Sequence, residues 1–183
     1  SGYSYFGMED PVVGGYTPEK VALRRAIGMA YDVQAEITQA RKGQAVLAQS
    51  IVPPQMSGFD PAFRSEMSEH SVARARGLLD LYGYRDRDGD GFREQPDGSP
   101  LTIEYSAQPD QASRLTQDLW NKAMKRIGVR MEFKIAKWPE QLKASRAGKL
   151  MMWGLAWSAT MPDGSDFLGL MYGPNKGQSN HAR

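Results

Sequence analysis

The chain has 183 residues, of which 40% are hydrophobic and 24% are charged, a composition typical of one globular domain. It contains no apolar run of the roughly 20 residues that a transmembrane helix needs. Its 23 basic and 21 acidic side chains are spread along the chain without the basic stripe that nucleic-acid binding favours. The absence of cysteine excludes disulfides and thiolate metal sites.

Two helices and an irregular segment are predicted over the first third of the chain. Thr17-Pro18-Glu19 begins the first helix, because a hydroxyl N-cap, a proline in the first turn and a following acid all favour a helix start. Asp32 caps a second, shorter helix, which Gly43 ends. Residues 44–67 are rich in proline and glycine and are predicted to be an irregular crossing segment. The apolar stripe of the first helix consists of Leu23, Ala26, Ile27, Ala30 and Tyr31.

Further helices are predicted over residues 69–82, over about 17 residues ending at Ile127, and over residues 139–147. Each of the first two is followed by a glycine that suits a helix C-terminus. Another short helix is expected to begin near Asp163.

Three strands are predicted in the second half of the chain. Apolar and polar residues alternate over residues 101–105 and 129–135, as in half-buried strands. Residues 150–157 are apolar or glycine at every position, so we expect this strand to be the most buried one and to lie centrally. Strands that alternate with helices indicate an α/β lobe whose ligand lies beyond the carboxyl ends of the strands.

An Asp/Gly-rich turn is predicted over residues 85–100. Asp86, Asp88 and Asp90 match the first half of a calcium-binding loop. However, Arg93 replaces the customary apolar residue, and the twelfth position holds an aspartate in place of glutamate. We therefore expect these three aspartates to cap the backbone amides of a β-hairpin turn rather than to hold calcium.

The residues needed for catalysis are scarce. The two histidines, His70 and His181, are too few for a zinc site and suggest no serine hydrolase. The glycine pairs lack the strand-to-helix context of a phosphate-binding loop. We expect no catalytic residues and no cofactor.

Several short motifs follow one another along the chain. They are Ala22–Ile27 leading to Ala30-Tyr31-Asp32, Val52-Pro53-Pro54 with Gly58-Phe59-Asp60-Pro61, Ala73–Leu79, Tyr82-Gly83-Tyr84 with Asp88-Gly89-Asp90-Gly91, and Ala156-Trp157-Ser158-Ala159 before Pro162-Asp163. In this order they resemble the bacterial family of oligopeptide-, dipeptide- and nickel-binding receptors of ABC importers. The resemblance implies a two-lobed, periplasmic-binding-protein-like fold, with residues 1–183 as a single, C-terminal-type lobe that contains a mixed sheet with helices packed on it.

The resemblance also implies a ligand-binding segment. Trp138 and Trp157 match positions that form the walls of side-chain pockets in the family, although core packing is the alternative for a tryptophan on a buried strand. Thr160 stands where peptide-binding members have an aspartate that receives the ligand's α-ammonium group. Asp163 is a substitute anion or, alternatively, a helix N-cap or turn former. The expected ligand-binding residues are Trp138, Trp157, Ser158, Thr160, Met161 and Asp163.

The implied function is capture of a peptide or peptide-like solute between two lobes, followed by delivery to the membrane subunits of an ABC permease. A monomer that binds no nucleic acid is expected, in the periplasm or elsewhere outside the cytoplasm, with or without a lipid anchor. Two alternatives remain: a partner-binding or regulatory module that kept the receptor fold, and an α/β enzyme.

Overall fold

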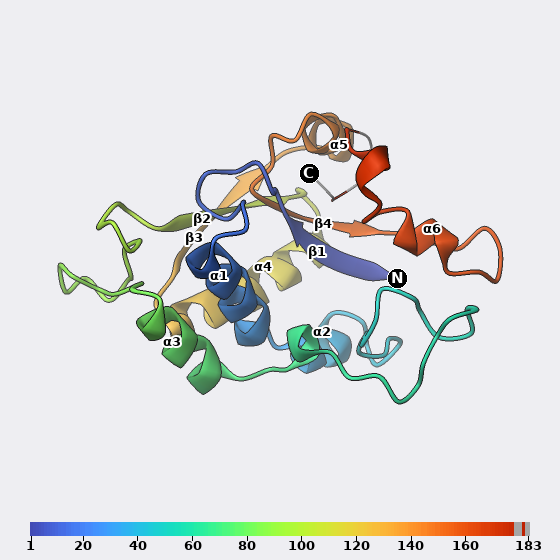
Figure 1. Ribbon diagram of the computed structural model, residues 1–183, viewed down its shortest axis with the longest axis horizontal. Coiled ribbons are helices and arrows are strands. Elements are labelled where there is room, and N and C mark those ends of the chain that lie inside the picture. Colours follow the sequence, from blue (N-terminus) through green and yellow to red (C-terminus); the bar gives the residue numbers. More distant parts are fainter. Residues whose placement is uncertain (178–180, 182–183) are drawn as a thin grey trace.

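A mixed four-stranded sheet forms the centre of the protein, with helices on both sides (Figure 1). The computed structural model describes residues 1–177 and residue 181. Strands β2 (Thr102–Ala107), β3 (Arg130–Ile135) and β4 (Met152–Ala156) run parallel, and β1 (Gly2–Phe6) pairs antiparallel with β4. The strand order is β1-β4-β2-β3. The α/β prediction is confirmed, whereas β1 was not predicted.

The predicted helices are present, and local signals explain where they begin and end. Asp32 caps α2, since its Oδ1 accepts a 2.9 Å hydrogen bond from the main-chain N–H of Ala35. Gly128 ends α4 with φ of +69°, a conformation that favours glycine. The α-helices are α1 (Pro18–Ala30), α2 (Val33–Gln39), α3 (Val72–Leu81), α4 (Gln111–Ile127), α5 (Trp138–Arg146) and α6 (Ser165–Leu168), and the 3₁₀ helices are η1 (Glu66–Ser68) and η2 (Gly173–Asn175).

Helices α1, α3 and α4 cover one side of the sheet and α5 covers the other (Figure 1). On the first side, Tyr31 stacks on Trp120 with ring centroids 4.1 Å apart, and both belong to the main hydrophobic core. On the other side, the buried amide of Gln141 on α5 donates a 2.9 Å hydrogen bond to the main-chain oxygen of Ala107 at the end of β2. Trp153 is also buried, so Trp120 and Trp153 are both core residues.

The expectation that β4 is the most buried strand is wrong in part. The strand lies inside the sheet between β1 and β2, but β2 is more buried. Leu155 is half-buried and Ala156 is exposed. The reason is that β4 pairs with β1 over its whole length but with β2 only where Met152 faces Tyr105. The carboxyl half of β4 therefore runs beyond the cover of the central strand.

Candidate functional site

The parallel strands β2, β3 and β4 end at one edge of the sheet, and the two predicted tryptophans follow the ends of two of them. Trp138 is the first residue of α5, just after β3, and its side chain is 47% exposed. Trp157 comes directly after β4 and is half-buried. Within the described chain, no ring contact joins the two tryptophans. They therefore offer two separate aromatic surfaces at the edge where α/β proteins bind ligands.

The main chain of Trp157 is bound to the N-terminal segment. Its N–H donates to the oxygen of Ser1 at 2.8 Å, and its oxygen accepts from the nitrogen of Ser1 at 2.7 Å. Main-chain groups of successive strand residues point to alternate sides. Those of Ala156 and Ser158 therefore point away from β1, and both residues are exposed. No strand pairs with these two residues on that side within the described chain.

The indole of Trp157 is held in place by a residue that sequence reasoning missed. Its Nε1–H donates a 2.6 Å hydrogen bond to the hydroxyl of Tyr3 on β1. Burial raises the pKa of the Tyr3 phenol to about 12, so the hydroxyl stays protonated at neutral pH. The alternation of Tyr3 and Tyr5 around Ser4 was the sequence signal for this strand.

Thr160 is hydrogen-bonded to Asp166, an acid that is not among the expected ligand-binding residues. The main-chain N–H and the hydroxyl of Thr160 both donate to Oδ2 of Asp166 at 2.8 Å. These two hydrogen bonds hold the pKa of Asp166 below its usual value. Asp163 instead accepts a 2.8 Å hydrogen bond from the N–H of Ser165 at the start of α6. This bond to the residue two positions along matches the turn-forming interpretation of Asp163, since the N-cap of α6 is Gly164.

The irregular crossing segment, residues 44–67, packs against the loop that carries these acids. Ser57 forms a parallel bridge with Asp163, and its N–H donates to the oxygen of Pro162 at 3.2 Å. A Cβ on Gly164 would lie 3.1 Å from the side chain of buried Val52. The loop after β4 therefore packs against a segment that lies about 100 residues earlier in the chain. Met161 on this loop is 63% exposed.

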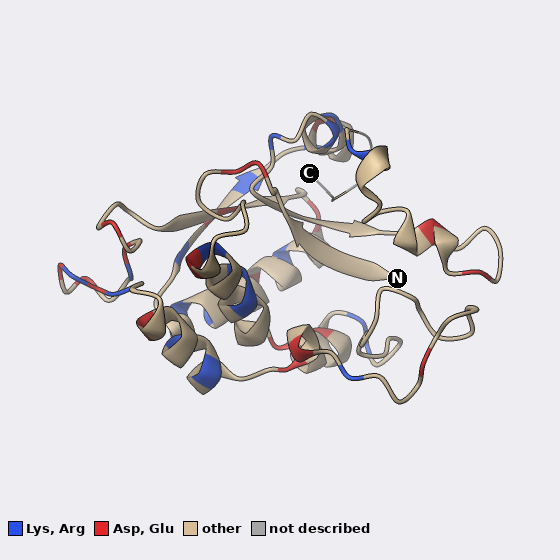
Figure 2. Ribbon diagram, viewed as in Figure 1, with Lys and Arg blue, Asp and Glu red and all other residues tan. Residues whose placement is uncertain are grey.

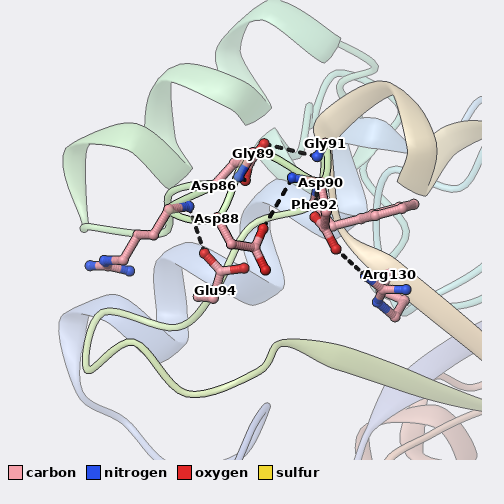
Figure 3. Close-up of polar contacts among 9 residues, drawn as sticks. Asp86, Asp88, Gly89, Asp90, Gly91, Phe92, Glu94 and Arg130 are labelled. Carbon is pink, nitrogen blue, oxygen red and sulfur yellow. Dashed lines mark hydrogen bonds and ion pairs between the residues drawn. The ribbon is translucent and has the colours of Figure 1, made fainter.

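The Asp/Gly-rich turn lies at the opposite end of the molecule from this edge (Figure 1). Asp86 accepts hydrogen bonds from the N–H groups of Gly89 and Gly91, at 2.7 and 2.9 Å. Asp88 likewise accepts from Asp90 at 3.0 Å, as Figure 3 shows. The prediction that these aspartates cap the turn is confirmed.

Four carboxylates gather at this turn, those of Asp86, Asp88, Asp90 and Glu94, with one oxygen of each within 4.8 Å of the others. Asp90 also forms a 2.6 Å ion pair with Arg130 (Figure 3). The guanidinium of Arg130 lies 4.5 Å above the ring of Phe92. A protein cation thus already neutralises part of the charge, and the expected absence of calcium stays a prediction.

Charges are mixed over most of the described chain (Figure 2). The site segment differs, because between Lys149 and Lys176 the charged residues are Asp163 and Asp166. The loop beyond β4 therefore carries net negative charge. Within the described residues, no helix is long and apolar enough to cross a membrane.

Residues 3–179 match a family described as bacterial extracellular solute-binding proteins, family 5 Middle. Over 155 residues the chain is 25% identical to di/tripeptide-binding protein 1 of Pseudomonas aeruginosa strain UCBPP-PA14. This alignment covers 85% of the present chain and 27% of that protein. The structure of HbpA2 from Haemophilus parasuis has a TM-score of 0.80 at 20% identity, covering 100% of this chain and 33% of that one. The structure of a dipeptide-binding protein from Pseudoalteromonas sp. SM9913, in complex with Met-Leu, has a TM-score of 0.76 at 20% identity. It covers 99% of this chain and 33% of that one.

The chain spans about a third or less of the length of these relatives. The solved structures share its fold, and the family match extends over nearly all of it. The family and the relatives are named as binding proteins. The chain belongs to the family 5 bacterial extracellular solute-binding proteins.

Proposed function

We propose that this chain is one lobe of the substrate-binding component of an ABC importer and captures a peptide or peptide-like solute against the edge that carries Trp138 and Trp157. A second lobe closes over the solute, and the complex delivers it to a membrane permease. The family match supports the receptor class. The names of the relatives, a di/tripeptide-binding protein and a dipeptide-binding protein, support a peptide as the solute.

The observation that carries the proposal is the unpaired side of β4. Ala156 and Ser158 present main-chain groups on the side away from β1, where no strand of the described chain covers them. An extended peptide can add to such an edge as an extra strand, which gives affinity for any peptide main chain regardless of its side chains. Side chains of the peptide would then alternate between the two sides of the added strand.

The surroundings of this edge suit the rest of a peptide. Trp157, Trp138 and Met161 are apolar surfaces at the edge, and large aromatic side chains give contact area that tolerates many sequences. The carboxylate of Asp166 is fixed by two hydrogen bonds from Thr160 and can accept a hydrogen bond from an ammonium group of the solute. A charge-assisted hydrogen bond is about twice as strong as a neutral one. The acidic loop therefore favours a cationic group on the bound solute.

The receptor acts as a monomer outside the cytoplasm, free in a periplasm or held by a lipid anchor. Lobe closure is a hinge motion that is stabilised by contacts a ligand makes to both lobes at once.

Thermal denaturation of the two-lobed receptor with a library of short peptides tests the proposal. A peptide at 100 times its Kd adds about 2.7 kcal/mol to the free energy of unfolding, and mass spectrometry should recover it intact. Hydrolysed peptide would indicate an enzyme. A melting temperature that no peptide changes would instead favour a partner-binding module that kept the receptor fold.

A further inference from the structure

The Trp157 indole lies at the start of a hydrogen-bonded chain that crosses three distant parts of the sequence. Its N–H donates to the Tyr3 hydroxyl at 2.6 Å, and this hydroxyl lies 2.7 Å from Nε2 of His181. Since the Tyr3 oxygen accepts from the indole, its own proton is available for His181. That arrangement requires a neutral imidazole with its proton on Nδ1.

The imidazole is in turn fixed by aromatic neighbours. It stacks on Tyr5 with ring centroids 4.2 Å apart and meets Tyr3 edge to face at 5.4 Å. Burial lowers the pKa of His181 to about 4, which keeps the ring neutral near pH 7. Tyr5 is held at its other end, where its hydroxyl lies 2.5 Å from the hydroxyl of Ser145 on α5.

The hydrogen bond from Trp157 to Tyr3 limits how a ligand can interact with the indole. Trp157 has one hydrogen-bond donor, and Tyr3 already accepts from it. A ligand that meets Trp157 therefore finds a fixed aromatic ring without an available N–H. Such a ring attracts apolar groups, other aromatic rings and cations, whereas a ligand acceptor group would lose its water and gain no hydrogen bond.

We infer that Tyr3 is a positioning residue that fixes the ring of Trp157 and withdraws its N–H from recognition, so that this wall of the site selects apolar, aromatic or basic side chains over carboxylate and carboxamide side chains. This inference rests on the proposed function, because it assumes that Trp157 meets the solute. Tyr3 acts through Trp157 and makes no contact with the solute itself.

The test uses the two-lobed receptor in three forms: wild type, Tyr3→Phe and Tyr5→Phe. Tyr3→Phe keeps the ring next to His181 but removes the acceptor for the indole. Tyr5→Phe removes a hydroxyl two residues further along the same strand and leaves the indole bond intact, so it serves as the matched control. With tryptophan labelled at the indole nitrogen, the Trp157 N–H resonance, assigned by its loss in Trp157→Phe, should move in Tyr3→Phe and stay in place in Tyr5→Phe.

The second readout is selectivity, measured by calorimetry with tripeptides that differ only in their central Leu, Phe, Lys, Asp or Asn. Wild type and Tyr5→Phe should bind the first three more tightly than the last two. In Tyr3→Phe the ratio of Kd values between the two groups should fall by about fivefold, because the freed indole N–H can donate a hydrogen bond to the Asp or Asn side chain. An unmoved indole resonance, or equal selectivity in Tyr3→Phe and wild type, would overturn the inference. If no tripeptide binds wild type, the proposed function fails and the selectivity claim fails with it, while the indole resonance still decides whether Tyr3 holds Trp157.

Discussion

Replacing Arg93 with methionine removes a guanidinium that ties together the ends of two helices and the Asp/Gly-rich turn. Its side chain is only 10% exposed. Nε donates to the oxygen of Ile127 at 2.8 Å, and Nη1 donates to the oxygen of Tyr84 at 2.6 Å. A third hydrogen bond, 2.5 Å long, reaches Oδ1 of Asp80, whose side chain is 60% exposed. The methylene groups of Arg93 pack against Gly128.

The expected loss follows from these contacts. Methionine keeps most of the apolar packing but leaves two main-chain oxygens without their donor, and an unsatisfied buried group costs about 1–3 kcal/mol. The ion pair with exposed Asp80 adds less than about 1 kcal/mol. Arg93→Met should therefore lower the free energy of unfolding by about 3 kcal/mol, and Asp80→Asn by under about 1 kcal/mol.

Urea unfolding followed by circular dichroism measures both variants, with equal denaturant slopes as evidence that the same fold is compared. Arg93→Lys is the control that keeps the charge but has no fork to reach both oxygens, and it should fall between methionine and wild type. The reasoning is refuted if Arg93→Met lies within about 0.5 kcal/mol of wild type, or if Asp80→Asn costs as much as Arg93→Met.

Three other perturbations have expected outcomes. Gly7→Ala places a Cβ 2.1 Å from the main-chain oxygen of Leu150, so chemical unfolding should show a loss of about 3 kcal/mol or more; a neutral substitution would contradict the close packing there. Because burial lowers the folded-state pKa of His181 to about 4 from 6.5, its contribution to stability is complete above pH 6.5 and is lost as the pH falls towards 4. Between pH 6.5 and 4 the free energy of unfolding should therefore drop by about 1–2 kcal/mol, after allowance for the partial exposure of the ring. If a His181→Gln variant shows the same drop, another group is responsible for it. Millimolar calcium should leave the melting temperature unchanged, because Asp90 already pairs with Arg130; a rise of several degrees that a chelator reverses would disprove this.

Features set by neighbouring residues could be predicted from sequence. The cap at Asp32 and the left-handed turn at Gly128 depend on residues a few positions away, so the helices they bound were expected close to where they lie. The aspartates of the turn bind amides two to five residues along the chain. The order of strands and helices from residue 101 onward likewise followed from local periodicity.

Features that depend on distant partners were missed. Strand β1 is short and pairs with residues about 150 positions later, so its own pattern carried little signal. The incomplete burial of β4 depends on how far β2 accompanies it. The bond between Thr160 and Asp166 is local but was also missed, because it depends on the conformation of an irregular loop. The bond of Tyr3 to His181 spans 178 residues.

Calorimetric titration of the two-lobed receptor with short peptides, as wild type and with Trp157→Ala or Leu81→Ala, tests the central claim most directly. Leu81 on α3 is 76% exposed, and its helix packs on α1, away from β4. We predict that wild type and Leu81→Ala bind the same peptides with equal Kd, while Trp157→Ala binds them at least about tenfold more weakly, the loss of roughly 1.4 kcal/mol of aromatic contact. Equal affinity in all three proteins would contradict a solute site at the carboxyl edge of this sheet.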